Sequence, residues 1–139
     1  MAIAALDLGK RRIGVAIAEG TEASALPIGA IARYSLKRDI EAIAALIGSR
    51  NVDRVVVGLP LNMDGTEGPQ ARAAQAFARH LSEATHVPVE LYDERLTSFE
   101  AEDRLKGTSS RGHVSKKSVD AVAAAIILEG WLQSAGRTR

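Results

Sequence analysis

Apolar positions follow two different periods along the chain, and these periods predict a mixture of strands and helices. Residues 1–8 and 12–18 are apolar runs separated by a short connection, which predicts a β-hairpin. We expect a third strand within residues 26–33. A continuous valine run in residues 54–60 is typical of a strand buried on both faces of a parallel sheet, and residues 87–92 predict a further strand.

Three other segments show the spacing of amphipathic helices, with apolar residues three and four positions apart. They are residues 39–49, 74–81 and 119–127. Thr97, followed three residues later by a glutamate, forms a capping-box pattern that predicts another helix start. Ser115 or Ser118 would cap the last helix.

Two polar segments interrupt this pattern. Residues 61–69, LNMDGTEGP, are rich in Asn, Asp, Gly and Pro and predict a loop. Residues 107–118 are polar, basic and rich in Gly and Ser, which predicts a mobile stretch.

The order of these elements predicts an α/β fold. We expect a mixed five-stranded sheet, made of three antiparallel N-terminal strands plus two parallel strands, with helices on both faces. The length of 139 residues suits one domain over residues 1–139, and no linker or repeat divides it. No apolar run is long enough to span a membrane, and Asp7 comes too early for a signal peptide, so we expect a cytoplasmic protein without a membrane partner.

Composition excludes several kinds of chemistry. The chain has no cysteine, which excludes disulfides, thiolate zinc sites and a cysteine nucleophile. The three histidines, His80, His86 and His113, lack the spacing of a zinc site, and neither GxSxG nor a phosphate-binding GxxxxGK[ST] loop occurs. Aromatic residues are only 4% of the chain, too few for a broad base-stacking surface.

The net charge of +1 hides strong local charges. Residues 104–117 contain five basic residues and no acidic one, and the predicted hairpin turn carries three more. Such clusters suit contacts to phosphates, although a charge run can also be a solvated face. The basic residues are Arg104, Lys106, Arg111, Lys116 and Lys117, with Lys10, Arg11 and Arg12 at the turn.

Acidic residues stand where burial makes them costly. Asp7 lies inside an apolar strand, Asp93 and Glu94 lie at a strand end, and Asp120 lies in the first turn of the predicted last helix. In a mixed sheet the first strand and the two parallel strands can be neighbours, with the last helix crossing their carboxyl ends. The acids could therefore converge, and gathered carboxylates favour hard divalent cations, which activate water for phosphodiester hydrolysis.

Each acid also has a simpler interpretation. Asp7 could form a turn before Gly9. Asp120 could complement the helix dipole. Asp93 or Glu94 could form a strand-end salt bridge to Arg95.

Four sequence blocks resemble those of the YqgF/RuvX family: DLGKRRIGVA, VVVGLPLNMDGTEG, DERLTS and KKSVDAVAAAIIL, in this order. The resemblance implies an RNase H-like fold related to the RuvC-type Holliday junction resolvases. Members of the family are described as Holliday junction resolvases and as nucleases that mature the 5′ end of pre-16S ribosomal RNA.

Carried over to this chain, the acidic positions of the family fall on Asp7, on Glu94 in preference to Asp93, and on Asp120. We expect these three acids to hold one or two Mg²⁺ or Mn²⁺ ions that orient water for in-line attack, with Asp93 as a helper. A junction resolvase would also need two active sites and so a two-fold homodimer. The predicted contacts to pre-rRNA or branched DNA are Lys10, Arg11, Arg12, Asn62, Gly65, Arg95, Arg111, Lys116 and Lys117.

Two other classes compete with this interpretation. The N-terminal hairpin also resembles the phosphate-binding hairpin of the actin and sugar-kinase superfamily, but those proteins need two such domains. A non-catalytic RNA-binding factor of ribosome assembly would use the same acids structurally. Dependence of activity on a metal ion separates that factor from a nuclease.

Overall fold

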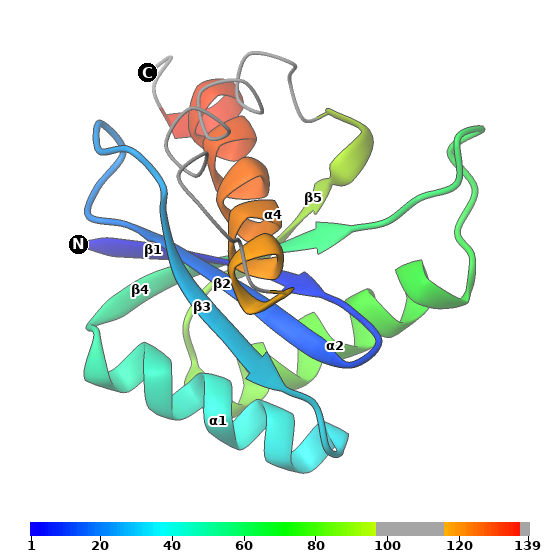
Figure 1. Ribbon diagram of the computed structural model, residues 1–139, viewed down its shortest axis with the longest axis horizontal. Helices are drawn as coiled ribbons and strands as arrows, with labels where there is room; N and C mark the ends of the chain where they lie inside the picture. Colours follow the sequence, from blue (N-terminus) through cyan, green and yellow to red (C-terminus); the bar gives the residue numbers. More distant parts are fainter. Residues whose placement is uncertain (97–115, 137–139) are drawn as a thin grey trace.

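Five strands form one mixed sheet in the computed structural model, which describes residues 1–96 and 116–136 (Figure 1). Their order in the sheet is β3-β2-β1-β4-β5. The pairs β1–β2 and β2–β3 are antiparallel, and the pairs β1–β4 and β4–β5 are parallel. The predicted α/β fold and its division into antiparallel and parallel strands are therefore confirmed. The strands are β1 (Ala2–Leu8), β2 (Arg12–Ala18), β3 (Leu26–Ala32), β4 (Val52–Leu59) and β5 (Val89–Asp93).

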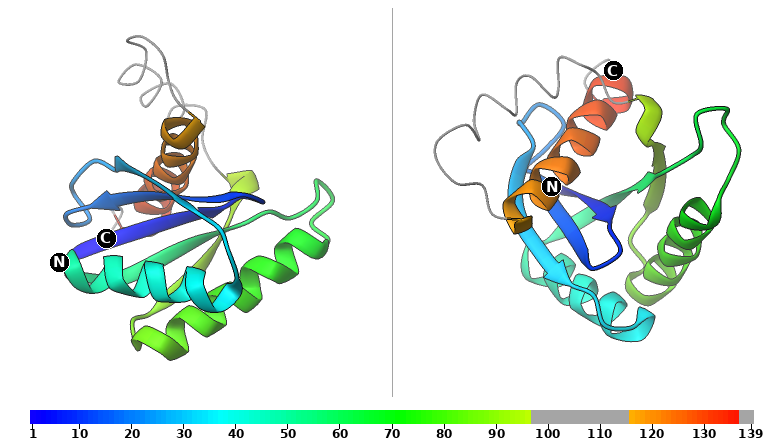
Figure 2. Two further views of the ribbon diagram at one scale, coloured as in Figure 1. Left: turned by 60° about the horizontal axis from the view of Figure 1, so that its bottom comes forward. Right: turned by 45° about the vertical axis from the view of Figure 1, so that its right-hand side comes forward.

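Helices cover both faces of this sheet, as the sequence predicts (Figure 2). The helices α1 (Leu36–Ser49) and α2 (Pro69–Thr85) lie on one face, and α4 (Lys116–Trp131) lies on the other. The 3-10 turn η1 (Glu94–Leu96) follows β5, and the π-helical turn η2 (Leu132–Gly136) follows α4.

Two apolar cores separate the layers. Leu6, Ile43 and Phe77 are buried between the sheet and the pair α1 and α2. Ile3 and Leu128 are buried between the sheet and α4. Successive residues of β1 point to opposite faces, so this strand is apolar on both sides up to its carboxyl end.

The start of α4 corrects two predictions. The helix begins at Lys116, so Asp120 lies in its second turn and not in its first. Since the dipole effect falls off within the first turn, the interpretation of Asp120 as a dipole acid loses its basis. Ser118 lies inside the helix and is not its cap, whereas Ser115 is outside the described residues.

Residues 116–118 were predicted to belong to a mobile stretch over residues 107–118, and they instead form the first turn of α4. The rest of that stretch, residues 107–115, the helix start at Thr97 and Arg111 lie outside the described residues. Within residues 1–96 and 116–136, no helix combines the length and the apolar character that crossing a membrane requires.

Candidate active site

The register of the sheet places Asp7 between two glycines. Asp7 pairs with Gly14 of β2, and on the other side Gly58 follows Val57, the partner of Leu6 in β4. Asp7 lies on the face that α4 covers, since Ile3 is buried there and alternate residues of a strand share a face. The carboxylate is therefore flanked by two positions without side chains.

Asp120 reaches this place because Gly14 lets α4 approach. A Cβ atom at Gly14 would lie 2.0 Å from the backbone oxygen of Asp120, so any other residue would push the helix away. The Asp120 carboxylate comes close enough to repel that of Asp7. Burial and this repulsion both raise the pKa of Asp7.

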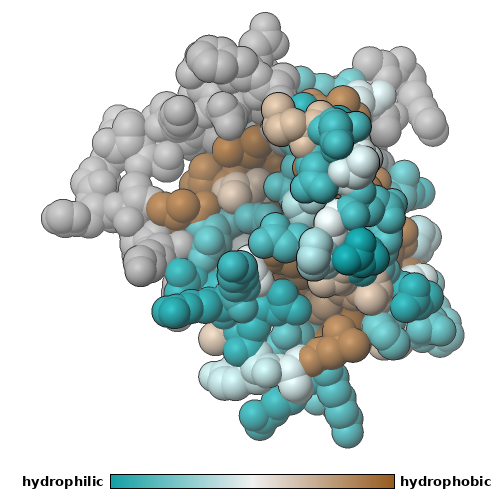
Figure 3. All heavy atoms as spheres, turned by 90° about the vertical axis from the view of Figure 1, so that its right-hand side faces the viewer, coloured by the Kyte–Doolittle hydropathy of each residue, from teal (hydrophilic) through white to brown (hydrophobic). Residues whose placement is uncertain are grey.

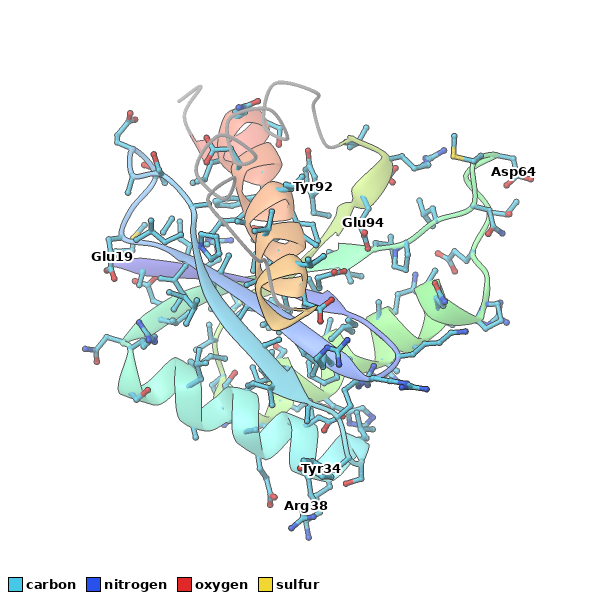
Figure 4. The ribbon with its side chains drawn as sticks, in the orientation of Figure 1. Glu19, Tyr34, Arg38, Asp64, Tyr92 and Glu94 are labelled. Carbon is cyan, nitrogen blue, oxygen red and sulfur yellow. The ribbon has the colours of Figure 1, made fainter. Side chains whose placement is uncertain are left out.

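Glu94 reaches the same place over Gly58. A Cβ atom at Gly58 would lie 2.9 Å from Oε2 of Glu94. Figure 4 shows Glu94 beyond β5, beside the end of β4. Burial, followed by the charges of Asp7 and Asp93, raises the pKa of Glu94 to about 7. This carboxyl group is poised between its two protonation states near neutral pH.

The three acids thus meet at one end of the sheet without forming a closed cluster. In the part of the chain that the structure describes, no three His, Asp or Glu side chains are grouped closely enough to hold a metal ion. Asp120 is instead paired with Arg12, whose Nε donates to Oδ2 at 2.6 Å. Arg12, predicted to contact phosphate, is therefore engaged with an acid of the site.

Asp93 has a different environment from Glu94. The guanidinium of Arg95 donates to both carboxylate oxygens of Asp93, with Nη2 to Oδ2 at 2.8 Å, and the backbone N–H of Arg95 donates to Oδ1 at 2.9 Å. These bonds lower the pKa of Asp93. The strand-end salt bridge that the sequence left open is thus formed by Asp93, and Glu94 is the acid beside Asp7.

Arg95 also fastens the loop of residues 60–68. Its Nη1 donates to the backbone oxygen of Met63 at 3.2 Å. Within the loop, the Asn62 amide donates to Thr66 Oγ1 at 2.9 Å, and the backbone N–H of Gly65, with φ of 88°, donates to Asn62 O. Asn62, Gly65 and Arg95, all predicted to contact nucleic acid, together define the shape of this loop.

The remaining predicted contacts are divided between two places. Lys10 and Arg11 are exposed in the hairpin connection between β1 and β2. Lys116 and Lys117 begin α4, one turn before Asp120. The face that carries the loop of residues 60–68 is mainly hydrophilic, with its apolar residues in separate small groups (Figure 3).

The sequence pattern did not identify Gly14, Gly58 or a partly buried ion pair between Arg33 and Asp39. The carboxylate of Asp39, only 3% exposed, accepts from Arg33 Nε at 3.2 Å, and Arg33 Nη1 donates to the backbone oxygen of Gly9 at 2.9 Å. This chain of bonds fixes the connection that follows Asp7. A lone glycine inside each of two apolar strands was the available signal.

The donor set fits a hard divalent cation. Asp7, Glu94 and Asp120 offer only oxygen atoms, which Mg²⁺ and Mn²⁺ prefer. Burial first, and repulsion between carboxylates second, raise the pKa values of Asp7 and Glu94, and a bound cation would offset both effects.

Sequence comparisons point to one family. A family model described as "RuvX: Holliday junction resolvase" matches residues 1–134. A protein of Anaeromyxobacter sp. (strain K), named "Putative pre-16S rRNA nuclease", is 50% identical over 127 residues, which cover 91% of this chain and 93% of that protein. A Chloroflexus aurantiacus protein of the same name is 47% identical over 132 residues, which cover 95% of this chain and 86% of that protein.

Solved structures share the fold at low sequence identity. RuvC of T. thermophilus in complex with a Holliday junction substrate superposes with a TM-score of 0.67 and 15% identity, covering 96% of this chain and 95% of that chain. The fowlpox virus Holliday junction resolvase gives a TM-score of 0.59 and 14% identity, covering 96% and 99%. The expected RNase H-like fold of the RuvC type is confirmed.

Proposed function

Since the chain belongs to the RuvX family of Holliday junction resolvases, we propose that Asp7, Glu94 and Asp120 form its active site for cleaving nucleic-acid phosphodiester bonds. The expectation of a phosphodiester-hydrolysing enzyme is confirmed by the family match and by relatives that are named as nucleases. The domain over residues 1–139 and its cytoplasmic location are parts of the same proposal.

The convergence of three acids over two glycines carries this proposal. Asp7 occupies the end of a buried strand, and Gly14 and Gly58 each admit a second carboxylate to its side. Partly buried carboxylates that repel one another destabilise a fold, so such an arrangement indicates a role in binding a cation. A purely structural use of these acids would not require two glycines around them.

Asp7, Glu94 and Asp120 would hold one or two Mg²⁺ or Mn²⁺ ions. When bound, such ions activate water and offset the charge that develops on the phosphate. The fold contributes position: β1 fixes Asp7, the end of β5 fixes Glu94, and α4 fixes Asp120. The Arg95 guanidinium pairs with Asp93 and holds the adjacent loop.

The end of a pre-16S ribosomal RNA is the first substrate to test. Two relatives that are 47% and 50% identical to this chain are named as pre-16S rRNA nucleases. A four-way DNA junction is the second, because the family description and the shared fold favour it. Junction cleavage would place two chains around a two-fold axis, one active site for each strand. Lys10 and Arg11, exposed in the connection that follows β1, would contact the phosphates of either substrate.

The test incubates the purified chain with a pre-16S RNA leader and with a four-way DNA junction, each with Mg²⁺, Mn²⁺ or a chelator. We expect cleavage only with a divalent ion, and its loss in Asp7→Asn and Asp120→Asn. Asp53→Asn, which removes an exposed carboxylate of β4, is the matched control and should cleave like the wild type.

Cleavage that survives in either active-site variant, or in chelator, would refute the carboxylate site. RNA binding without cleavage under any condition would instead support a non-catalytic factor of ribosome assembly. Metal-dependent cleavage of the junction alone would retain the site and remove RNA processing from the proposal.

A further inference from the structure

The ion pair between Arg12 and Asp120 joins two groups that the proposed reaction needs for different purposes. Asp120 belongs to the proposed cation ligands, and Arg12, the first residue of β2, follows the basic hairpin connection. Their Nε and Oδ2 atoms are 2.6 Å apart, and each side chain is 29% exposed. The lone pair that accepts this hydrogen bond is not available to a metal ion at the same time.

The backbone holds the two partners together. Arg12 opens β2 and lies on the same face as Gly14, two residues further on. Since α4 packs on Gly14 at the position of Asp120, the helix carries its carboxylate directly to the guanidinium. Such a pair differs from an exposed salt bridge, in which two long side chains must be ordered for little gain.

Arg12 offsets the charge of Asp120 in the protein without a metal ion. Asp120 stands close enough to Asp7 to repel it, and the guanidinium reduces that repulsion by supplying one positive charge. The same positive charge repels a divalent cation that approaches Asp120. The acids therefore form an incomplete site while Arg12 stays, in keeping with the lack of a closed cluster among the described residues.

A phosphate group is the natural competitor for Arg12, because guanidinium groups bind phosphate through paired, charge-assisted hydrogen bonds. Lys10 and Arg11 lie exposed next to Arg12 in the chain and would attract the nucleic-acid backbone to this edge. Both partners of the ion pair are partly open to solvent, so a phosphate can reach the guanidinium.

We propose that Arg12 is an exchangeable counter-ion, which pairs with Asp120 in the free protein and moves to a substrate phosphate when nucleic acid binds. Asp120 is then released to the divalent cation. This inference rests on the proposed function. The exchange makes nucleic-acid binding and metal binding reinforce each other. By thermodynamic linkage, nucleic acid raises the affinity for the metal ion by the same factor by which the metal ion raises the affinity for nucleic acid. The cation site is completed only in the presence of substrate.

The first test measures Mn²⁺ binding by calorimetry without nucleic acid. We expect Arg12→Gln to bind Mn²⁺ about tenfold more tightly than the wild type, because one repelling charge is removed. Arg54→Gln is the control, since it breaks a pair of similar length, with Glu90 Oε2 at 2.7 Å from Arg54 Nη1, in another part of the sheet. Its Mn²⁺ affinity should equal that of the wild type.

Two further measurements make the test specific. In an Asp120→Asn background, Arg12→Gln should no longer increase the affinity for Mn²⁺. A short phosphorothioate RNA, which resists hydrolysis, should increase the Mn²⁺ affinity of the wild type and leave that of Arg12→Gln nearly unchanged. Heat from Mn²⁺ binding to the RNA alone is subtracted.

Weaker Mn²⁺ binding by Arg12→Gln would overturn the inference, because it would mean that Arg12 orients Asp120 for the ion. Equal affinities, or RNA coupling that persists in Arg12→Gln, would overturn it as well. These results leave the proposed function intact as long as Asp7→Asn and Asp120→Asn weaken Mn²⁺ binding. Mn²⁺ binding that is absent, or indifferent to both acids, would refute the proposed function together with the inference.

Discussion

Replacing Glu94 by glutamine should stabilise the metal-free protein, with a gain that depends on pH. The pKa of Glu94 rises from 4.5 to about 7 because of burial and the charges of Asp7 and Asp93. Each tenfold change in acid strength corresponds to about 1.4 kcal/mol, which sets an upper bound of about 3 kcal/mol. Since the side chain keeps contact with water, which screens these charges, we expect a gain of about 1 to 2 kcal/mol.

The sign follows from proton linkage. Below pH 4.5 the carboxyl group of Glu94 is protonated in the folded and unfolded states, so Glu94→Gln changes little. Between pH 4.5 and about 7 the unfolded state loses this proton first, and the wild type loses stability. Above pH 7 the full penalty is present, and the advantage of the variant reaches its plateau.

Urea denaturation at pH 4.5, 6 and 8 in the presence of a chelator measures this gain. Glu41→Gln, at an exposed position of α1, is the matched control and should show no comparable pH dependence. With Mg²⁺ added at pH 8, the wild type should recover stability and Glu94→Gln should not, because it lacks the ligand. A gain for Glu94→Gln that is equal at all three pH values would refute this account of the site.

Three other changes test the geometry of the site. Gly14→Ala should lower the free energy of unfolding by about 3 kcal/mol or more in urea denaturation, because its Cβ atom would lie 2.0 Å from the backbone oxygen of Asp120. A loss below about 0.5 kcal/mol would mean that α4 does not pack on Gly14. Gly58→Ala would meet only the flexible ends of Glu94 and Ile127, so we expect a loss of about 1 kcal/mol but more than a tenfold loss of nuclease activity. Full activity in Gly58→Ala would exclude Glu94 from the active site. Arg95→Gln should raise the pKa of Asp93 toward its usual value and speed amide hydrogen exchange in residues 61–66. Both effects can be measured by NMR, and unchanged hydrogen exchange would show that the loop is held without Arg95.

The strands and helices could be predicted because their apolar periods are consistent with their final burial. The valine run of β4 and the helical spacing in α1 and α2 each correspond to an element in the structure. The observed ends of these elements differ from the predicted ends where strand pairing or helix capping sets them. Val52 begins β4 because it pairs with Ala2, and α1 begins early because Ser35 accepts a hydrogen bond from the backbone N–H of Arg38.

The site could be predicted only in part. Asp7, Asp120 and the pair Asp93 and Glu94 could be selected from the sequence because buried or strand-end acids are costly, whereas the preference for Glu94 over Asp93 came from the family resemblance. The sequence did not indicate how they meet, since that depends on the register that sets Gly14 and Gly58 beside Asp7. Register is a property of paired strands, and a pattern of period two cannot identify the partner residue.

For the basic residues too, the sequence pattern did not indicate which partners they contact in the fold. A basic run at a hairpin predicts phosphate contacts for Lys10, Arg11 and Arg12 alike, yet only Arg12 opens the strand on the face that meets α4. Its partner Asp120 is 108 residues away in the sequence, so no local pattern could reveal the pair. A residue that contacts both an acid of the site and the substrate edge can link the two binding events, whereas Lys10 and Arg11 can only attract nucleic acid. Replacing Lys10 or Arg11 by a neutral residue should therefore weaken RNA binding by the contribution of one positive charge. In contrast to Arg12→Gln, these changes should leave the affinity for Mn²⁺ without RNA unchanged.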